Sequence, residues 1–251
     1  MIRVWRSEIR KLLRPRFVIS NFLVAFILQA TITATMFLKA TGSLITDLNK
    51  ASGLFYGTKT IASFLGIIIF CIFAANFAQE YGHGTLKNLL VRHPNRTTLI
   101  IGKLMALVTF TVALIGSTAI LSGAISYSLA SKAHVTTSNW NFTNSAFLAP
   151  LGNVLLAAVA YGALGSALAV ILRSSITAIS AGLIWFLVIE TLFGFLSKTL
   201  SKWLPGGNLA NFADGGSSDL SYLHSAAVVG GYSALGLVAL LIIFNKRDVA
   251  N

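Results

Sequence analysis

Charged residues are scarce in this chain of 251 residues: 10% are Asp, Glu, Lys or Arg, whereas 55% are apolar. A soluble domain carries about 25% charged residues, so this sequence has too few to cover a water-facing surface. The mean hydropathy of +0.79 agrees. We therefore expect lipid to be the solvent for most of the molecule.

Cysteine and the common catalytic motifs are also missing. The single cysteine, Cys71, excludes an internal disulfide framework and lies in an apolar run, where a packing role is expected. The sequence has no phosphate-binding glycine loop followed by Lys and Ser or Thr, so the chain is not itself an ATPase of that class. It has no His-Glu-x-x-His, no nucleophile elbow and no paired intramembrane aspartates. We expect no enzyme and no metal site, and energy must come from a partner or from an ion gradient.

Six apolar runs reach the roughly 20 residues that a membrane helix needs. They are 17–38, 60–78, 99–129, 147–172, 176–196 and 226–244. The first exceeds the 7–15 residues of a signal-peptide core, so we interpret it as a retained helix. The sequence therefore predicts an all-α polytopic membrane protein with six transmembrane helices in a single domain, residues 17–251.

Basic residues indicate the orientation and explain the net charge of +12. With six spans, both termini, the 79–98 segment and the turn at Arg173 share one side, which holds every arginine, while the other side holds six lysines. The positive-inside rule then places both termini in the cytoplasm of a cell membrane, most simply a bacterial plasma membrane. Because anionic lipid heads attract these residues, a nucleic-acid partner is unnecessary.

Residues 1–16 form a pattern of their own. Apolar residues recur at helical spacing on one face, and arginines recur on another until Pro15 breaks the pattern. The apolar set is Ile2, Trp5, Ile9, Leu12 and Leu13, and the basic set is Arg3, Arg6, Arg10 and Arg14. This predicts an amphipathic elbow helix lying flat at the cytoplasmic interface, with Trp5 at headgroup level. It can serve as an anchor and topology signal or pack against a cytoplasmic partner, and the two roles are compatible.

The segment 79–98, between the second and third spans, also predicts a short helix. Gly82 and Gly84 interrupt the outgoing span, and Gly84 or Thr85 can cap a new helix. Three leucines, Leu86, Leu89 and Leu90, then share one face, and Pro94 ends the pattern. Glu80 is either a solvated interfacial carboxylate or the partner of a nearby basic residue, an interaction of about 0–1 kcal/mol if exposed.

This segment resembles the signature of type 2 ABC exporter permeases. The matching string is Glu80-x-x-x-Gly84-Thr85-Leu86-Lys87-x-Leu89-Leu90-x-x-x-Pro94-x-Arg96, followed by Gly102-Lys103. Chain length, the elbow, the six spans and the closing Phe244-x-Lys246-Arg247-Asp248 add to the resemblance, while His93 departs from the apolar or small residue expected there. The resemblance implies that this string is a cytoplasmic coupling helix, which docks into a groove on a separate ATP-binding subunit.

The same resemblance implies a function and partners. The chain would pair with a second permease, an identical copy or a homologue, and with ATP-binding cassette subunits that hold ATP and magnesium. The substrate would be amphiphilic: an antibiotic, an antimicrobial peptide or a lipid, with antibiotic resistance as one consequence of efflux. An ion-coupled secondary transporter and a non-catalytic anchor subunit are the alternatives. Neither the substrate nor the choice between homodimer and heterodimer can be determined from the sequence.

Polar residues inside the spans are candidates for a substrate path. Glu190 is the only acidic residue well inside a predicted span, and such residues usually face a cavity or a partner. The alternatives for Glu190 are hydration near the outer interface or pairing with Lys198. Gln29 and Asn76 could line the same path, although hydrogen bonds between helices are their commoner role. The long outer connection 198–225 corresponds, by the resemblance, to short re-entrant helices that gate the exit.

Overall fold

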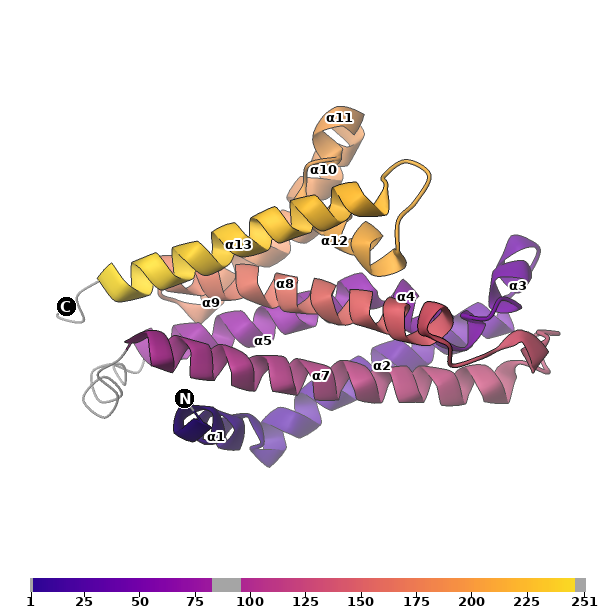
Figure 1. Cartoon of the computed structure of the whole chain (residues 1–251), viewed down its shortest axis with the longest axis horizontal. Coiled ribbons are helices and arrows are strands. Elements are labelled where there is room, and N and C mark those ends of the chain that lie inside the picture. The colour runs from indigo at the N-terminus through magenta and orange to yellow at the C-terminus, as the bar shows by residue number, and fades with distance from the viewer. Residues whose placement is uncertain (1, 83–95, 247–251) are drawn as a thin grey trace.

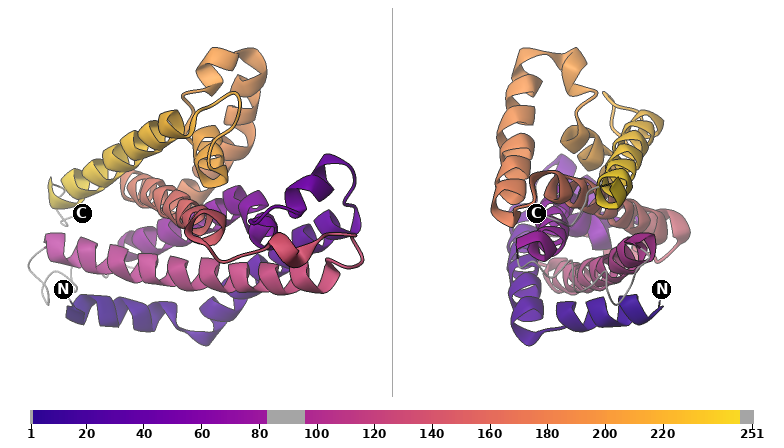
Figure 2. Two further views of the ribbon diagram at one scale, coloured as in Figure 1. Left: turned by 45° about the vertical axis from the view of Figure 1, so that its right-hand side comes forward. Right: turned by 90° about the vertical axis from the view of Figure 1, so that its left-hand side faces the viewer.

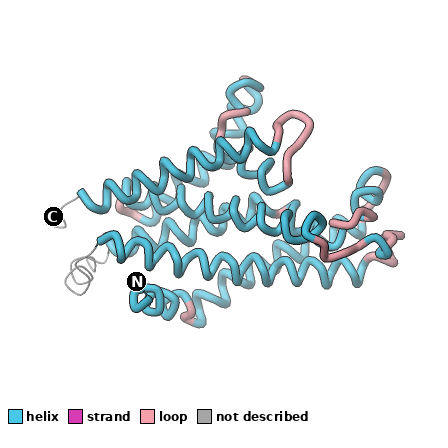
Figure 3. Tube along the Cα trace, viewed as in Figure 1, coloured by secondary structure: helices cyan, strands magenta, loops and turns pink. Residues whose placement is uncertain are grey.

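The computed structural model of the chain describes residues 2–82 and 96–246, and every regular element in these residues is helical (Figure 3). Six helices are long and apolar enough to cross a membrane. They cover Pro15–Leu38, Ala62–Gln79, Arg96–Leu129, Ser145–Leu172, Ser175–Leu196 and Tyr222–Phe244. Within residues 2–82 and 96–246, the predicted all-α architecture is confirmed. The six helices long and apolar enough to span a membrane match the predicted runs, with boundaries shifted by a few residues.

The spans are built from the following elements (Figure 1). The first three are α2 (Pro15–Leu38), α5 (Ala62–Gly82) and α7 (Arg96–Leu129). The fourth joins the π-helical turn η3 (Asn144–Leu148) to α8 (Ala149–Leu172), and the sixth is α13 (Tyr222–Lys246). The fifth is composite: α9 (Ser175–Ile184), the π-helical turn η4 (Trp185–Ile189) and α10 (Glu190–Leu196).

Shorter helices lie between and before the spans. They are α1 (Ile2–Leu12), α3 (Ser43–Leu48), η1 (Gly53–Phe55), α4 (Tyr56–Thr60), η2 (Thr137–Asn139), α11 (Lys198–Ser201) and α12 (Pro205–Asp214). The start of α2 follows the sequence closely, because Pro15 occupies its first position, where no amide hydrogen is needed. In Figure 1, α1, the start of α7 and the end of α13 lie at one end of the bundle and α3 at the other. Seen down the long axis of the bundle, α1 runs across it (Figure 2, right).

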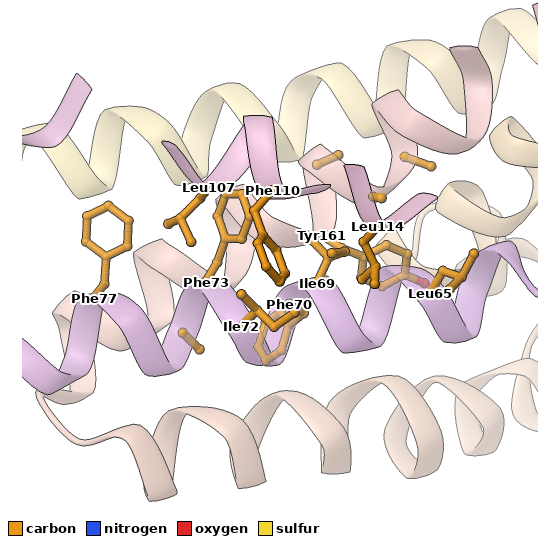
Figure 4. Close-up of a cluster of buried hydrophobic side chains, with 14 of the residues drawn as sticks. Leu65, Ile69, Phe70, Ile72, Phe73, Phe77, Leu107, Phe110, Leu114 and Tyr161 are labelled. Atoms are coloured by element: carbon orange, nitrogen blue, oxygen red, sulfur yellow. The ribbon is translucent and has the colours of Figure 1, made fainter. Parts of the chain in front are cut away.

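The core lies around α5, whose buried phenylalanines face α7, α8 and α9. Figure 4 shows Phe70, Phe73 and Phe77 beside Phe110 and Leu107 of α7. Small residues bring α8 close to α5, since a Cβ on Gly162 would lie 2.7 Å from the Phe73 ring. Close backbone approach at small residues is the usual way in which membrane helices pack.

Candidate functional site

The predicted coupling segment falls mostly outside the described residues. Gly84, Thr85, Leu86, Lys87, Leu89, Leu90 and Pro94 all lie there. Glu80 is in the last turn of α5, with only its backbone described, and Arg96 is the first residue of α7. The Arg96 Nη1 atom donates to the carbonyl oxygen of Phe244, 3.2 Å away near the end of α13. One boundary of the segment is thus bonded directly to the sixth span.

The helix α1 packs on α7 through a ridge that the sequence analysis did not identify. Val4, Glu8 and Leu12 are buried at successive helical turns, whereas Ile2 and Leu13, expected on the apolar face, are exposed. The predicted elbow arginines Arg6, Arg10 and Arg14 are exposed as well. Trp5 donates its indole N–H to Thr109 Oγ1 of α7, 3.2 Å away. The face of α1 that packs on α7 therefore shares Leu12 with the apolar face predicted for the membrane interface, and it includes an acid.

Glu8 is the acid on this ridge, and its partner Lys103 lies on α7. Both residues are 3% exposed, and Lys103 Nζ lies 3.7 Å from Glu8 Oε2. Lys11 of α1 pairs with the other oxygen of the same carboxylate. Lys103 Nζ also lies 5.2 Å from the centroid of the Phe77 ring on α5. A single ammonium group therefore contacts α1 and α5. It lies about two turns after the start of α7.

Glu190 is held at the amino-terminal end of α12. Its side chain projects from the first position of α10, directly after the π-helical turn, and the residue is 9% exposed. Its Oε1 atom accepts the indole N–H of Trp185 at 2.8 Å and the amide of Gly206 at 2.9 Å, and Oε2 accepts the amide of Gly207 at 3.1 Å. Gly206 and Gly207 are in the first turn of α12, whose amides have no partner inside the helix. The carboxylate satisfies them and faces the positive end of the helix dipole.

The other side of α12 is bonded to α13 and to the preceding loop. Asn208 donates to the carbonyl oxygens of Lys202 and Leu204, both at 2.8 Å. Ser225 at the start of α13 donates to Asn208 Oδ1 at 3.0 Å and accepts from Asn211 Nδ2 at 2.8 Å. The helix α12 is thus fixed to the fifth span by Glu190 and to the sixth span by Ser225.

A cavity of about 300 Å³ adjoins Glu190. Its wall comes from α5, α8, the fifth span, α11 and α12, and includes the rings of Phe64, Tyr161 and Phe186. Tyr161 and Phe186 meet edge to face, with ring centroids 5.0 Å apart. Hydroxyl groups of Ser63, Thr191 and Ser201 also line it. The space is small, and its wall includes three aromatic side chains and one carboxyl group.

Neither Gln29 nor Asn76, the other two candidate path residues, lines the cavity beside Glu190. Gln29 is fully buried and donates to Thr33 Oγ1 at 2.7 Å, in a polar seam where Thr33 Oγ1 is 3.5 Å from Ser122 Oγ of α7. Asn76 is half-buried on α5, nine residues or about 14 Å along the helix from Ile67, which lines the cavity. One predicted alternative for Glu190 was pairing with Lys198, and the structure contradicts it. The three ion pairs within residues 2–82 and 96–246 have Glu8 or Asp47 as their acid, and none has Glu190.

A second cavity, about 820 Å³, lies at the far end of α7. Five aromatic side chains line it: Phe55, Tyr127, Trp140, Phe142 and Phe147. The indole N–H of Trp140 is already used, because it donates to the carbonyl oxygen of Leu48 at 2.8 Å. None of the residues that line this cavity is charged. Unlike the Glu190 cavity, it has no charged side chain that could attract an ion of opposite charge.

Comparison with known proteins identifies a family. Residues 16–250 match a family described as "Protein of unknown function (DUF2705)", and the chain belongs to that family. No curated protein matches the sequence. The match covers all six spans and the segment between α5 and α7.

Proposed function

We propose that the chain is the membrane-spanning subunit of an ATP-driven exporter, in which a separate ATP-binding cassette subunit binds the segment between α5 and α7. The signature string resembles the coupling helix of type 2 ABC exporter permeases and is flanked by two spans. Both termini would be cytoplasmic, α1 would be the interfacial elbow, and a second permease copy or homologue would complete the pathway. ATP and magnesium would be bound by the cassette subunit.

The course of α5 is the observation that most favours this function. The helix begins next to the Glu190 cavity, where Ser63 lines the wall, and runs to Gly82 at the boundary of the predicted coupling segment. The twenty residues from Ser63 to Gly82 correspond to about 30 Å of continuous helix. Because a helix transmits displacement along its axis, movement of the coupling segment would reach the cavity wall through α5.

The contacts of the buried Lys103 and the half-buried Arg96 support the same mechanism. They join the first turns of α7 to α1, α5 and the end of α13. A partner that displaces the coupling segment would therefore move four helices together, because breaking buried polar contacts is costly. This is the mechanical property that a coupling device needs.

The test is co-purification of an ATPase subunit with the chain from the membranes of its host. The Leu90→Asp variant should release that subunit, because Leu90 is on the predicted apolar face of the coupling helix and a carboxylate there opposes docking. Leu223→Asp is the matched control. Leu223 is 79% exposed at the start of α13, whereas it is the other end of α13 that lies near the coupling segment. Retention of the ATPase by Leu90→Asp, or its absence from the unmodified chain, would refute the proposal. Transport that persists without any cassette subunit would favour an ion-coupled transporter instead.

A further inference from the structure

Glu190 is a buried acid with no basic partner beside it. It is the one acidic residue within the six spans, and no Lys, Arg or His of the described residues lies within 4.0 Å of its carboxylate. Charges inside a membrane protein are rare, because taking an ion out of water costs free energy that only a partner offsets. The positive end of the α12 dipole supplies about half of a unit charge. The dipole therefore offsets only part of the charge that an ionised Glu190 carries.

The carboxylate of Glu190 acts only as a hydrogen-bond acceptor and has an acceptor position left unused. All three partners are N–H donors: two of them bind Oε1 and one binds Oε2. A carboxylate has about four acceptor positions, so about one on Oε2 remains. Because Glu190 lines the cavity of about 300 Å³, a ligand there can approach the carboxylate.

The wall of this cavity has groups that suit an organic cation better than a metal ion. Phe64, Tyr161 and Phe186 present aromatic rings, and ring faces attract ammonium groups. Calcium binds about six to eight oxygens, commonly from several carboxylates. In the described part of the chain, no three His, Cys, Asp or Glu residues gather into a metal-binding group. One carboxylate within an aromatic wall matches the recognition chemistry of a substituted ammonium.

We propose that this cavity binds the substituted ammonium head of a cationic amphiphile, with Glu190 as its counter-ion and Phe64, Tyr161 and Phe186 as its aromatic wall. The volume is at the lower end of the range for small-molecule pockets, so it accommodates a head group rather than a whole amphiphile. The identification of this ligand as the exported substrate rests on the proposed function. The binding itself needs no ATPase and is measured on the chain alone.

The experiment measures equilibrium binding of radiolabelled benzyltrimethylammonium to the full-length chain in nanodiscs of uncharged lipid. We expect saturable binding that neopentylbenzene, its uncharged isostere, does not displace. Glu190→Gln keeps the size of the side chain and one acceptor oxygen but removes the charge, and should weaken binding at least about tenfold. Unchanged affinity in this variant, displacement by the uncharged isostere, or an absence of saturable binding to the unmodified chain would overturn the proposal.

A second pair of variants keeps the test decisive if Glu190→Gln folds poorly. Phe64 is 50% exposed and lines the cavity, whereas Phe195 is 86% exposed in the fifth span and does not. Phe64→Leu should weaken binding about two- to fivefold through the lost ring face, and Phe195→Leu should leave it unchanged. Equal affinities in these two variants would refute the aromatic site. An ATPase that co-purifies without ammonium binding would refute this inference alone, and binding without an ATPase partner would refute only the proposed function.

Discussion

Glu8 of α1 and Lys103 of α7 form an ion pair that is buried on both sides, with Nζ 3.7 Å from Oε2. A buried pair is poor evidence of extra stability, because desolvation offsets most of the attraction, but it fixes which surfaces meet. Here the pair fixes the register of α1 on α7. It lies close to the predicted coupling segment, so α1 and the start of α7 are expected to move as one body.

The ion pair predicts unequal effects of two lysine substitutions. Lys103→Met removes the buried partner of Glu8 and leaves that carboxylate with the half-exposed Lys11 alone. The free energy of unfolding should fall, by less than the about 3–5 kcal/mol that is typical of a broken buried pair, because Lys11 remains. Lys11→Met is the control on the same carboxylate and should cost about 0–1 kcal/mol. Unfolding of the purified chain in detergent measures both, and equal costs would show that the burial of Lys103 has no energetic consequence.

The contact of the fifth span with α5 predicts a second contrast, between two glycines of that span. A Cβ on Gly182 would lie 2.1 Å from Phe70 Cζ in the core, whereas a Cβ on Gly194 would meet nothing within 4 Å. Gly182→Ala should therefore destabilise the chain by about 1–3 kcal/mol through overpacking. Gly194→Ala should be neutral or stabilising by up to about 1 kcal/mol, since alanine favours helix. Thermal unfolding of the two variants decides, and a neutral Gly182→Ala would mean that the fifth span packs differently on α5.

The position of Glu190 at the start of α12 predicts a local loosening on its removal. Glu190→Ala leaves the amides of Gly206 and Gly207 without their acceptor, at a cost of about 1–3 kcal/mol. Hydrogen exchange followed by mass spectrometry should show faster exchange at the amino-terminal turn of α12, with little change in α7. Asp219→Ala, at an exposed position in the same connection, is the control and should leave this exchange unchanged. Unaltered protection of Gly206 and Gly207 in Glu190→Ala would contradict the capping role.

The sequence predicts the six spans well because each depends on hydropathy summed over a local run of residues. It also identifies Glu190 as exceptional, since one acid in an apolar run is visible without a structure. The partners of Glu190 are not visible, because Gly206 and Gly207 lie sixteen and seventeen residues away and meet it only after the chain turns back through α11. A helical pattern cannot predict this contact between two elements.

The face of α1 that packs on α7 was not predicted, for a different physical reason. The spacing of apolar residues indicates the face expected at the membrane interface, but it does not indicate the ridge of Val4, Glu8 and Leu12 that packs on α7. A small residue on the facing helix decides this, because Val4 fits against Gly102, where a Cβ would lie 2.7 Å from Val4 Cγ1. The signal that could have identified Glu8 is its isolation as the one acid among the first sixteen residues. The coupling helix itself remains a prediction, since most of it lies outside the described residues.

The double attachment of α12 predicts non-additive stabilities. Ser225→Ala removes the hydroxyl that bonds Asn208 and Asn211, and leaves polar atoms of these buried amides without that partner, at about 1–3 kcal/mol. If Glu190→Ala has already loosened the attachment of α12 to the fifth span, the bonds of Ser225 to α12 stabilise the fold less, and their loss costs less free energy. The double variant should therefore cost less than the sum of the single variants by about 0.5 kcal/mol or more, as neighbouring sites do. The comparison pair is Glu190→Ala with Lys103→Met, which share no partner and should add to within about 0.3–0.5 kcal/mol. Strict additivity in the first pair would mean that Glu190 and Ser225 hold α12 independently, and that the helix does not respond as one unit between the fifth and sixth spans.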